Sequence, residues 1–160
     1  TEVEMNDRKE RVKDAVGATK AAVEEGIVPG GEVTFIRAAR ALDTLKLTGD
    51  EKVGLDILRH ALELPFRWLV KNSGLDDGYY LKLVVESKET DFGVDVANGG
   101  VTGSMYKFGI IDPAKVTRSA LQNAASVATM ILTTEALVTE LPEKKDAPTP
   151  SPTPGMSEDY

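Results

Sequence analysis

Hydrophobic residues recur at helical spacing along most of the chain. Between Asp7 and about Glu25 they fall three or four positions apart, with charged residues on the opposite face. This pattern predicts an amphipathic helix that ends at Gly26. The same spacing predicts a short helix over about 32–42 and a longer one over about 51–72. Helices therefore account for most of the first half of the chain.

Individual residues predict where these helices begin, bend and end. Asp50 is placed to cap the helix over 51–72, and Pro65 within that helix predicts a kink or a division, because proline has no amide hydrogen. The glycine-rich segment 27–31 predicts a turn or loop. Residues 79–87 fit a short helix, although the valine-rich stretch around Val84 could also form a strand.

The second half combines short strands with one long helix. Residues 90–109 are rich in glycine and β-branched residues, which predicts short strands and tight turns. Asp112 followed by Pro113 predicts a helix start, with Asp112 as N-cap, and this helix should run to about Thr134. Residues 136–138 suit another short strand. The expected fold class is mainly α, with a few short β-strands.

Composition and charge narrow the possible functions. From Pro142 onward, proline alternates with small polar residues, so we expect 142–160 to be a disordered, proline-rich tail. The net charge of −7 disfavours partners such as nucleic acid and anionic membrane surfaces. The chain has no cysteine, which excludes disulfides and thiolate metal sites and fits a reducing compartment.

The residues alone give weak signals of chemistry. His60 is the only histidine, so an ordinary helix position is favoured over a zinc ligand. Asp14 lies off the apolar stripe of its helix, where a solvated carboxylate is the default interpretation. Gly30 and Gly31 expose amide groups before a predicted helix and could receive an anion, although most such pairs are only turns. The phosphate-loop patterns GxxxxGK(S/T) and GxGxxG are absent from the sequence.

Two longer stretches carry a specific resemblance. The first is Asp14-Ala15 followed by AAVEEGIVPGG at 21–31, and the second is GIIDPAKVTRSALQNAASVA at 109–128. Both are similar to the C-terminal part of group I (GroEL-type) chaperonins, in the same order and at nearly the same separation. Thr133-Thr134-Glu135 and the residues to Pro142 continue the match, so the resemblance covers about residues 1–142.

The resemblance implies a domain organisation and a larger machine. Residues 1–26 would be the helix that descends from the intermediate domain, and 27–141 the C-terminal half of the ATP-binding equatorial domain. The family assists protein folding in a sevenfold homo-oligomeric ring, which can be double. Unfolded clients and a lid co-chaperonin would bind an apical domain outside this sequence. A bacterial cytoplasm is the expected location, with an organelle matrix or stroma as the alternative.

The resemblance also implies site residues for ATP. Asp14 matches the carboxylate that orients or activates the attacking water, and so is the candidate catalytic residue. The candidate nucleotide-binding residues match the loop whose backbone approaches the nucleotide, the segment on the adenine side, the pocket wall and the acid that hydrogen-bonds the ribose: Gly30 and Gly31; Asp95, Val96 and Ala97; Ile110; and Asp112. The Mg²⁺ ligand and the phosphate-cradling loop would lie in an N-terminal part, so no metal ligand is expected in these residues.

Departures from the family pattern keep other interpretations open. Glu32 stands where a third glycine is usual, Asp95 where many members have asparagine, and the segment 98–103 is one residue longer. A non-catalytic helical interaction module is therefore the main alternative, while an unrelated α-helical enzyme lacks a catalytic constellation. Since residue 1 is Thr, we expect a truncated chain that on its own hydrolyses little or no ATP.

Overall fold

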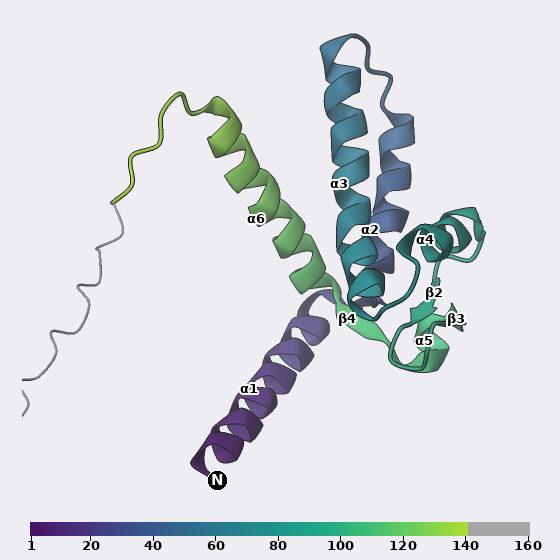
Figure 1. Ribbon diagram of the computed structural model, residues 1–160, viewed down its shortest axis with the longest axis vertical. Helices are drawn as coiled ribbons and strands as arrows, with labels where there is room; N and C mark the ends of the chain where they lie inside the picture. The colour runs from purple at the N-terminus through teal and green to yellow at the C-terminus, as the bar shows by residue number, and fades with distance from the viewer. Residues whose placement is uncertain (141–160) are drawn as a thin grey trace, which may run out of the picture.

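The computed structural model describes residues 1–140, and helices make up most of it (Figure 1). The mainly α fold class is therefore confirmed. In chain order the elements are α1 (Glu2–Glu25), β1 (Ile27–Pro29), α2 (Val33–Ala38), the 3₁₀ helix η1 (Ala39–Thr44), α3 (Asp50–Asn72), α4 (Asp77–Glu86), β2 (Phe92–Asp95), β3 (Val101–Ser104), α5 (Met105–Phe108), β4 (Ile111–Pro113) and α6 (Ala114–Thr133). The predicted tail 142–160 lies outside the described residues.

Helix α1 projects from the rest of the molecule (Figure 1). It begins at Glu2, before the predicted start, because Thr1 and Glu4 form a reciprocal capping box in which the Thr1 hydroxyl accepts a hydrogen bond from the Glu4 amide. It ends at Gly26, whose φ of 84° confirms the predicted stop. No residue of α1 is fully buried, and its apolar side chains as far as Val16 are exposed, whereas Ala18 and Ala22 near its C-terminal end are half-buried.

The helix predicted over 32–42 divides in two. Glu32 has a left-handed backbone with φ of 63° and therefore precedes α2, and the backbone tightens into η1 after Ala38. The helix is not divided at Pro65, because α3 is continuous through this residue. Leu62 and Phe66, which flank Pro65, are both buried, and this anchoring holds the helix together across the missing hydrogen bond.

One helix cap differs from the prediction, and a second cap was not predicted. Asp50 is the first residue of α3 rather than its cap, and Gly49 occupies the N-cap without a side-chain hydrogen bond. Helix α4 confirms the helical alternative for the segment around Val84, and the Asp76 carboxylate caps it by accepting from the Tyr79 amide at 2.9 Å.

A three-residue ladder joins distant parts of the chain. Strands β1 and β4 are antiparallel, with Val28 opposite Asp112 and Ile27 opposite Pro113. The predicted turn over 27–31 is therefore a strand in its first three residues. The prediction of Asp112 as an N-cap is wrong, because this ladder keeps residues 111–113 extended; α6 begins at Ala114, with Pro113 at the N-cap position.

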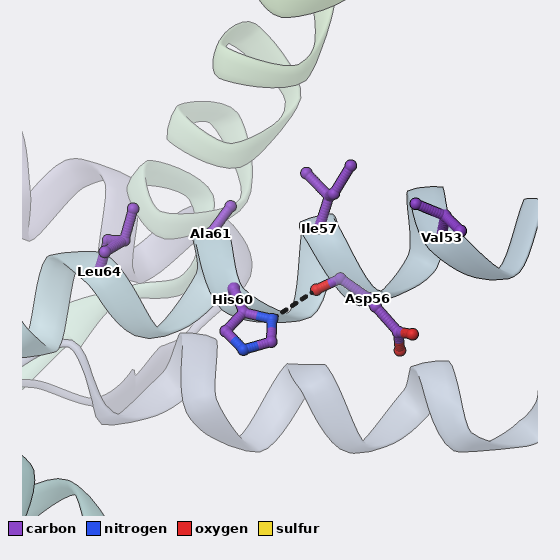
Figure 2. A pocket seen from close by; sticks show the side chains of 6 residues that line it. All are labelled: Val53, Asp56, Ile57, His60, Ala61 and Leu64. Atoms are coloured by element: carbon purple, nitrogen blue, oxygen red, sulfur yellow. Dashed lines mark hydrogen bonds between the residues drawn. The ribbon is translucent and has the colours of Figure 1, made fainter. Parts of the chain in front are cut away.

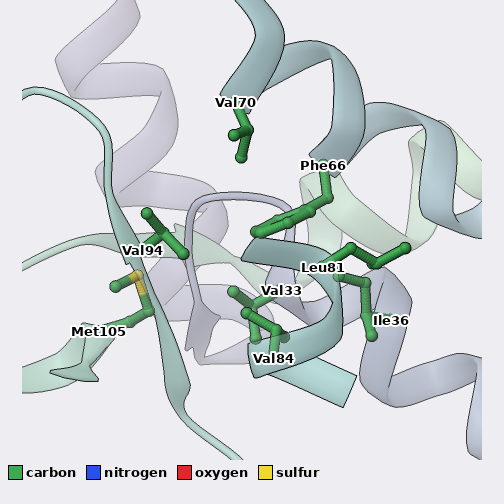
Figure 3. Close-up of a cluster of buried hydrophobic side chains, with 8 residues drawn as sticks. All are labelled: Val33, Ile36, Phe66, Val70, Leu81, Val84, Val94 and Met105. Atoms are coloured by element: carbon green, nitrogen blue, oxygen red, sulfur yellow. The ribbon is translucent and has the colours of Figure 1, made fainter. Parts of the chain in front are cut away.

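The core forms where α2, α3 and α4 meet the hairpin of β2 and β3 and the short helix α5 (Figure 3). Gly93 in β2 permits this close packing, since a Cβ there would stand 2.6 Å from Val33 Cγ2 and 2.8 Å from Met105 Cγ. The eight buried residues of the cluster are Val33, Ile36, Phe66, Val70, Leu81, Val84, Val94 and Met105.

The end of the described chain has no regular structure after α6. The predicted strand over 136–138 is wrong: these residues pair with no strand within 1–140. Leu137 and Val138 are exposed, as are the apolar residues near the end of α6. Figure 1 shows α6 and α3 diverging from the region of β4, so their facing sides stand apart.

Candidate functional site

The glycine loop after β1 is held against the segment that leads into β4. The Gly30 amide donates a hydrogen bond to the Ile110 carbonyl at 3.0 Å, and a Cβ on Gly30 would stand only 3.0 Å from the Ile111 nitrogen. Gly31 has φ of 68°, a conformation that favours glycine. A Cβ on Gly31 would also face Ile110 and Met105. The structure thus brings the predicted site residues Gly30 and Gly31 together with Ile110, which lies about 80 positions later in the sequence.

Asp112 lies beside this loop through the pairing of β4 with β1. Its carboxyl group is half-buried, and burial raises the pKa of Asp112 above its ordinary value. It lines a hollow of about 160 Å³ between α1 and β4. The other residues around the hollow are Ala18, Thr19, Ala22, Ile27, Ile111 and Pro113.

Asp14 lies outside this hollow but on the same side of α1. It is four residues before Ala18, which places the two side chains on one helix face about 6 Å apart along the axis. The Asp14 carboxylate is exposed, and no hydrogen bond or ion pair to it is found within residues 1–140. The described structure therefore does not bring Asp14 into contact with the glycine loop.

Asp95 holds its own turn in place. It is 8% exposed, and one carboxylate oxygen accepts from the amides of Ala97 and Asn98 at 3.1 and 3.2 Å. The other oxygen accepts from the Asn98 side chain at 2.6 Å. Strand β2 lies close to the loop of Gly30 and Gly31, since the Val94 carbonyl oxygen is 3.9 Å from the position that a Cβ on Gly31 would occupy. Asp95 thus orients the segment containing Val96 and Ala97, with its carboxylate already satisfied.

Glu32 adds a second acid to this region. It is half-buried, and the pKa of Glu32 is raised by burial and, to a lesser extent, by the negative charge of Asp112. The sequence identified Glu32 as a departure from the family pattern, but only the β1–β4 ladder places it near Asp112. Helix α2, which follows, has six residues, so its dipole offers little positive charge to offset the two acids.

The two raised pKa values predict a pH dependence of stability. Both groups ionise at higher pH in the folded than in the unfolded chain, so their ionisation disfavours folding. Their stabilising contribution is complete below the unfolded pKa values, about pH 4, and is lost as pH rises through the folded values. Urea unfolding should therefore show that Glu32→Gln/Asp112→Asn gains stability over wild type as pH rises from about 4 to 7. Parallel pH profiles for the two proteins would contradict this.

Ion pairs tie the end of α1 to the start of α6. The Arg118 guanidinium donates to both carboxylate oxygens of Glu25, at 3.0 and 2.6 Å, and Lys115 pairs with Glu24. The hydrogen bond from Arg118 lowers the pKa of Glu25, while Glu25 raises that of Arg118. This link was not predicted from the sequence. The sequence did contain a signal for it: two acidic residues end the first predicted helix, and two basic residues lie in the first turn of the last one.

Removing this link should loosen α1 at its base. We expect Arg118→Ala to increase hydrogen exchange of the amides near Glu25, because one of the two ion pairs that join this end of α1 to α6 is lost. The matched control is Lys13→Ala, which removes an ion pair between two residues of α1 itself. Equal exchange in the two variants would show that the Glu25 pair does not hold the helix.

His60 lies away from these residues. Its Nδ1 is 2.8 Å from the Asp56 carbonyl oxygen, one turn earlier on α3. Figure 2 shows the apolar residues Val53, Ile57, Ala61 and Leu64 along one side of the helix, with the imidazole turned away from them. Within residues 1–140 there is no cluster of three or more potential metal ligands. No helix in the same range is long and apolar enough to cross a membrane.

Comparisons with known proteins give a consistent result. A model of the TCP-1/cpn60 chaperonin family matches residues 1–142. Among solved structures, the chain is similar to a group III chaperonin crystallised in the open state, with 32% sequence identity and a TM-score of 0.74. This match covers 82% of the present chain and 28% of that chaperonin chain.

Proposed function

The chain belongs to the TCP-1/cpn60 chaperonin family, and from this premise we propose that it forms part of an ATP-dependent chaperonin subunit that assists protein folding. The observation that carries the ATP site is the junction of Gly30, Gly31 and Ile110 with Asp112, made by the β1–β4 ladder. Membership of group I specifically stays a prediction, and so does the cytoplasmic location.

The residues at this junction fit part of a nucleotide site. Glycine at 30 and 31 lets this loop pack closely against Ile110, and Asp112 offers a half-buried carboxylate to a ribose hydroxyl. The hollow of about 160 Å³ is smaller than the roughly 300 Å³ of common ligand pockets, which fits a site completed by other protein. Val96 and Ala97 would contact the adenine. Bound Mg²⁺ would neutralise phosphate charge through ligands outside this chain.

Asp14 is proposed as the residue that orients or activates water for hydrolysis. Its exposure and its position one turn beyond the hollow, on the same helix face, support a role toward a ligand rather than in packing. Because phosphoryl transfer depends on positioning and charge neutralisation, the 160 residues alone should hydrolyse little or no ATP.

The larger assembly is part of the proposal. The chain spans 28% of the length of the solved chaperonin that it matches. We propose that the subunit forms a homo-oligomeric ring, sevenfold and possibly double if the group I resemblance holds. Unfolded clients and a lid co-chaperonin would bind an apical domain of the same subunit. The exposed apolar residues of α1 and α6 fit contacts with further protein.

A second candidate function is a non-catalytic helical interaction module. Glu32 favours it, since this half-buried acid places negative charge next to the glycine loop, and a nucleotide is itself negatively charged. The coding sequence upstream of Thr1 discriminates between the two candidates. A segment of Gly-Asp-Gly-Thr-Thr type in the same frame supports the ATPase, whereas a start codon immediately before Thr1 supports the module.

Asp112→Ala in the complete subunit tests the proposed nucleotide site. A hydrogen bond to a charged group contributes about 1.5–3 kcal/mol, so ADP affinity should fall by about 10- to 150-fold in calorimetric titration. Asp56→Ala, which removes an exposed carboxylate on α3, is the control and should bind ADP as wild type does. Unchanged ADP affinity in Asp112→Ala would contradict the site.

A further inference from the structure

The loop that joins β2 to β3 contains a chemically reactive pair of residues. Strand β2 ends at Asp95, which pairs with Val101 of β3, so residues 96–100 form the loop. The chain has four asparagines, and Asn98 is the only one that precedes a glycine. Asparagine is a labile residue, and because glycine has no Cβ, its amide nitrogen can approach the side chain of a preceding asparagine. Asn98 and Gly99 are both exposed, so water has access to the pair.

The Gly99 amide is the free amide of this loop. The amides of Ala97 and Asn98 donate to one carboxylate oxygen of Asp95 at 3.1 and 3.2 Å. The Gly100 amide donates to the Asp95 carbonyl oxygen at 2.9 Å. No hydrogen bond from the Gly99 amide is found in the described part of the chain, and a Cβ added at Gly99 would meet no atom within 4 Å. The nitrogen that can attack the Asn98 side chain is therefore unbonded, in a residue that no other segment covers.

The side-chain amide of Asn98 has a structural role of its own. Its Nδ2 donates to the second carboxylate oxygen of Asp95 at 2.6 Å, and Asp95 is only 8% exposed. Replacing the NH₂ group at position 98 by a carboxylate oxygen would remove this donor and place a second negative charge against the Asp95 carboxylate. A buried acceptor without its donor and two adjacent like charges both destabilise the structure around them. Such a change would therefore weaken the turn that Asp95 holds in place.

We propose that Asn98 is a site of spontaneous deamidation, and that the product loosens the turn of residues 95–98. The Gly99 nitrogen bonds to Asn98 Cγ and gives up its proton, the Cγ–Nδ2 bond breaks, and the side-chain nitrogen leaves as ammonia. Water then opens the resulting succinimide ring to aspartate or isoaspartate at position 98. Water is the one co-reactant, and the inference does not depend on nucleotide binding. The fraction of chains with a loosened turn therefore increases with the age of the protein.

Peptide mapping of the complete subunit tests the reaction. The protein is incubated in mildly alkaline buffer and digested with trypsin, which releases residues 89–107 as one peptide. This peptide contains no other asparagine and no glutamine, so the mass increase from exchange of NH₂ for OH identifies Asn98. We expect it to convert faster than the peptides that contain Asn72 or Asn123, whose following residues carry side chains. A sample without incubation corrects for conversion during digestion.

Variants at position 98 test the consequence for the turn. Asn98→Ala removes one hydrogen bond to a charged group, so the amides of the 95–100 segment should exchange hydrogen about tenfold faster. Asn98→Asp reproduces the product and should exchange faster still, because it also adds repulsion, and added salt should reduce this excess. Asn72→Asp, which adds the same charge at the end of α3, is the control and should leave exchange in the segment unchanged.

Two results would overturn the inference. The first is conversion of Asn98 in the folded subunit no faster than that of Asn72, while the free peptide 89–107 reacts, since the fold would then protect the site. The second is wild-type hydrogen exchange in Asn98→Asp. Incubated wild type gives the same test without a substitution, because exchange in the segment should accelerate in proportion to the converted fraction.

Discussion

Asp14→Ala in the complete subunit is expected to retain ATP binding while the rate of ATP hydrolysis falls by about 10²- to 10⁴-fold, the usual contribution of a group that activates water. Binding should persist because Asp14 lies one helical turn beyond the hollow that Asp112 lines, and touches none of the loop residues. Steady-state phosphate release gives the hydrolysis rate, and calorimetry with ADP gives the affinity.

Asp7→Ala is the matched control for this experiment. Asp7 is an exposed aspartate on the same helix, seven residues earlier and so on nearly the same face, but two turns farther from the hollow. It should hydrolyse ATP at the wild-type rate. If Asp14→Ala also kept the wild-type rate, its assignment as the catalytic residue would be wrong, whereas equal losses in both variants would indicate a general effect of charge on α1.

The largest expected effect on stability follows the removal of a core aromatic ring. Phe66 is 1% exposed and belongs to the central cluster, so Phe66→Ala should lower the free energy of unfolding by about 3–5 kcal/mol through lost burial and the cavity left behind. Urea unfolding of the 160-residue chain, followed by the circular dichroism of its helices, measures the change.

Trp68→Ala provides the comparison on the same helix. Trp68 is larger than Phe66 but 57% exposed, and its one aromatic interaction in the described chain is a cation–π contact with Lys71 at 5.2 Å. Its removal should change the free energy of unfolding by about 0.5 kcal/mol. Equal losses for Phe66→Ala and Trp68→Ala would show that the cluster around Phe66 is not the stabilising core.

The helices were predictable because their signals are local. Periodic apolar residues predicted α1 and α3, the Asp112-Pro113 pair predicted a helix near the start of α6, and Gly26 marked the end of α1. The predictions failed where the local structure depends on contact with a segment that is distant in the sequence. Residues 27–29 and 111–113 each resemble a turn or cap, and only their pairing across the chain makes them strands. Pro65 similarly suggested a break that buried neighbours prevent.

The candidate site was predictable only in part. Resemblance to chaperonins selected Gly31, Ile110 and Asp112, whereas the residues by themselves gave a glycine pair of uncertain meaning. The approach of Glu32 to Asp112 depends on the β1–β4 ladder, so no local pattern could indicate it. The roles of Asp14, Asp95 and the other site residues stay predictions, because the described geometry places them without showing a ligand.

The attachment of α1 has a mechanical consequence. The helix is anchored at its C-terminal end, through Gly26, the neighbouring ladder and the ion pairs with α6, and buries none of its residues. A rigid helix attached in this way would act as a lever arm with its pivot near Gly26. Asp14 lies 12 residues from this pivot, about 18 Å, so a swing of only 10° would carry its carboxylate about 3 Å. That travel is comparable to the length of one hydrogen bond, enough to engage or withdraw a catalytic group.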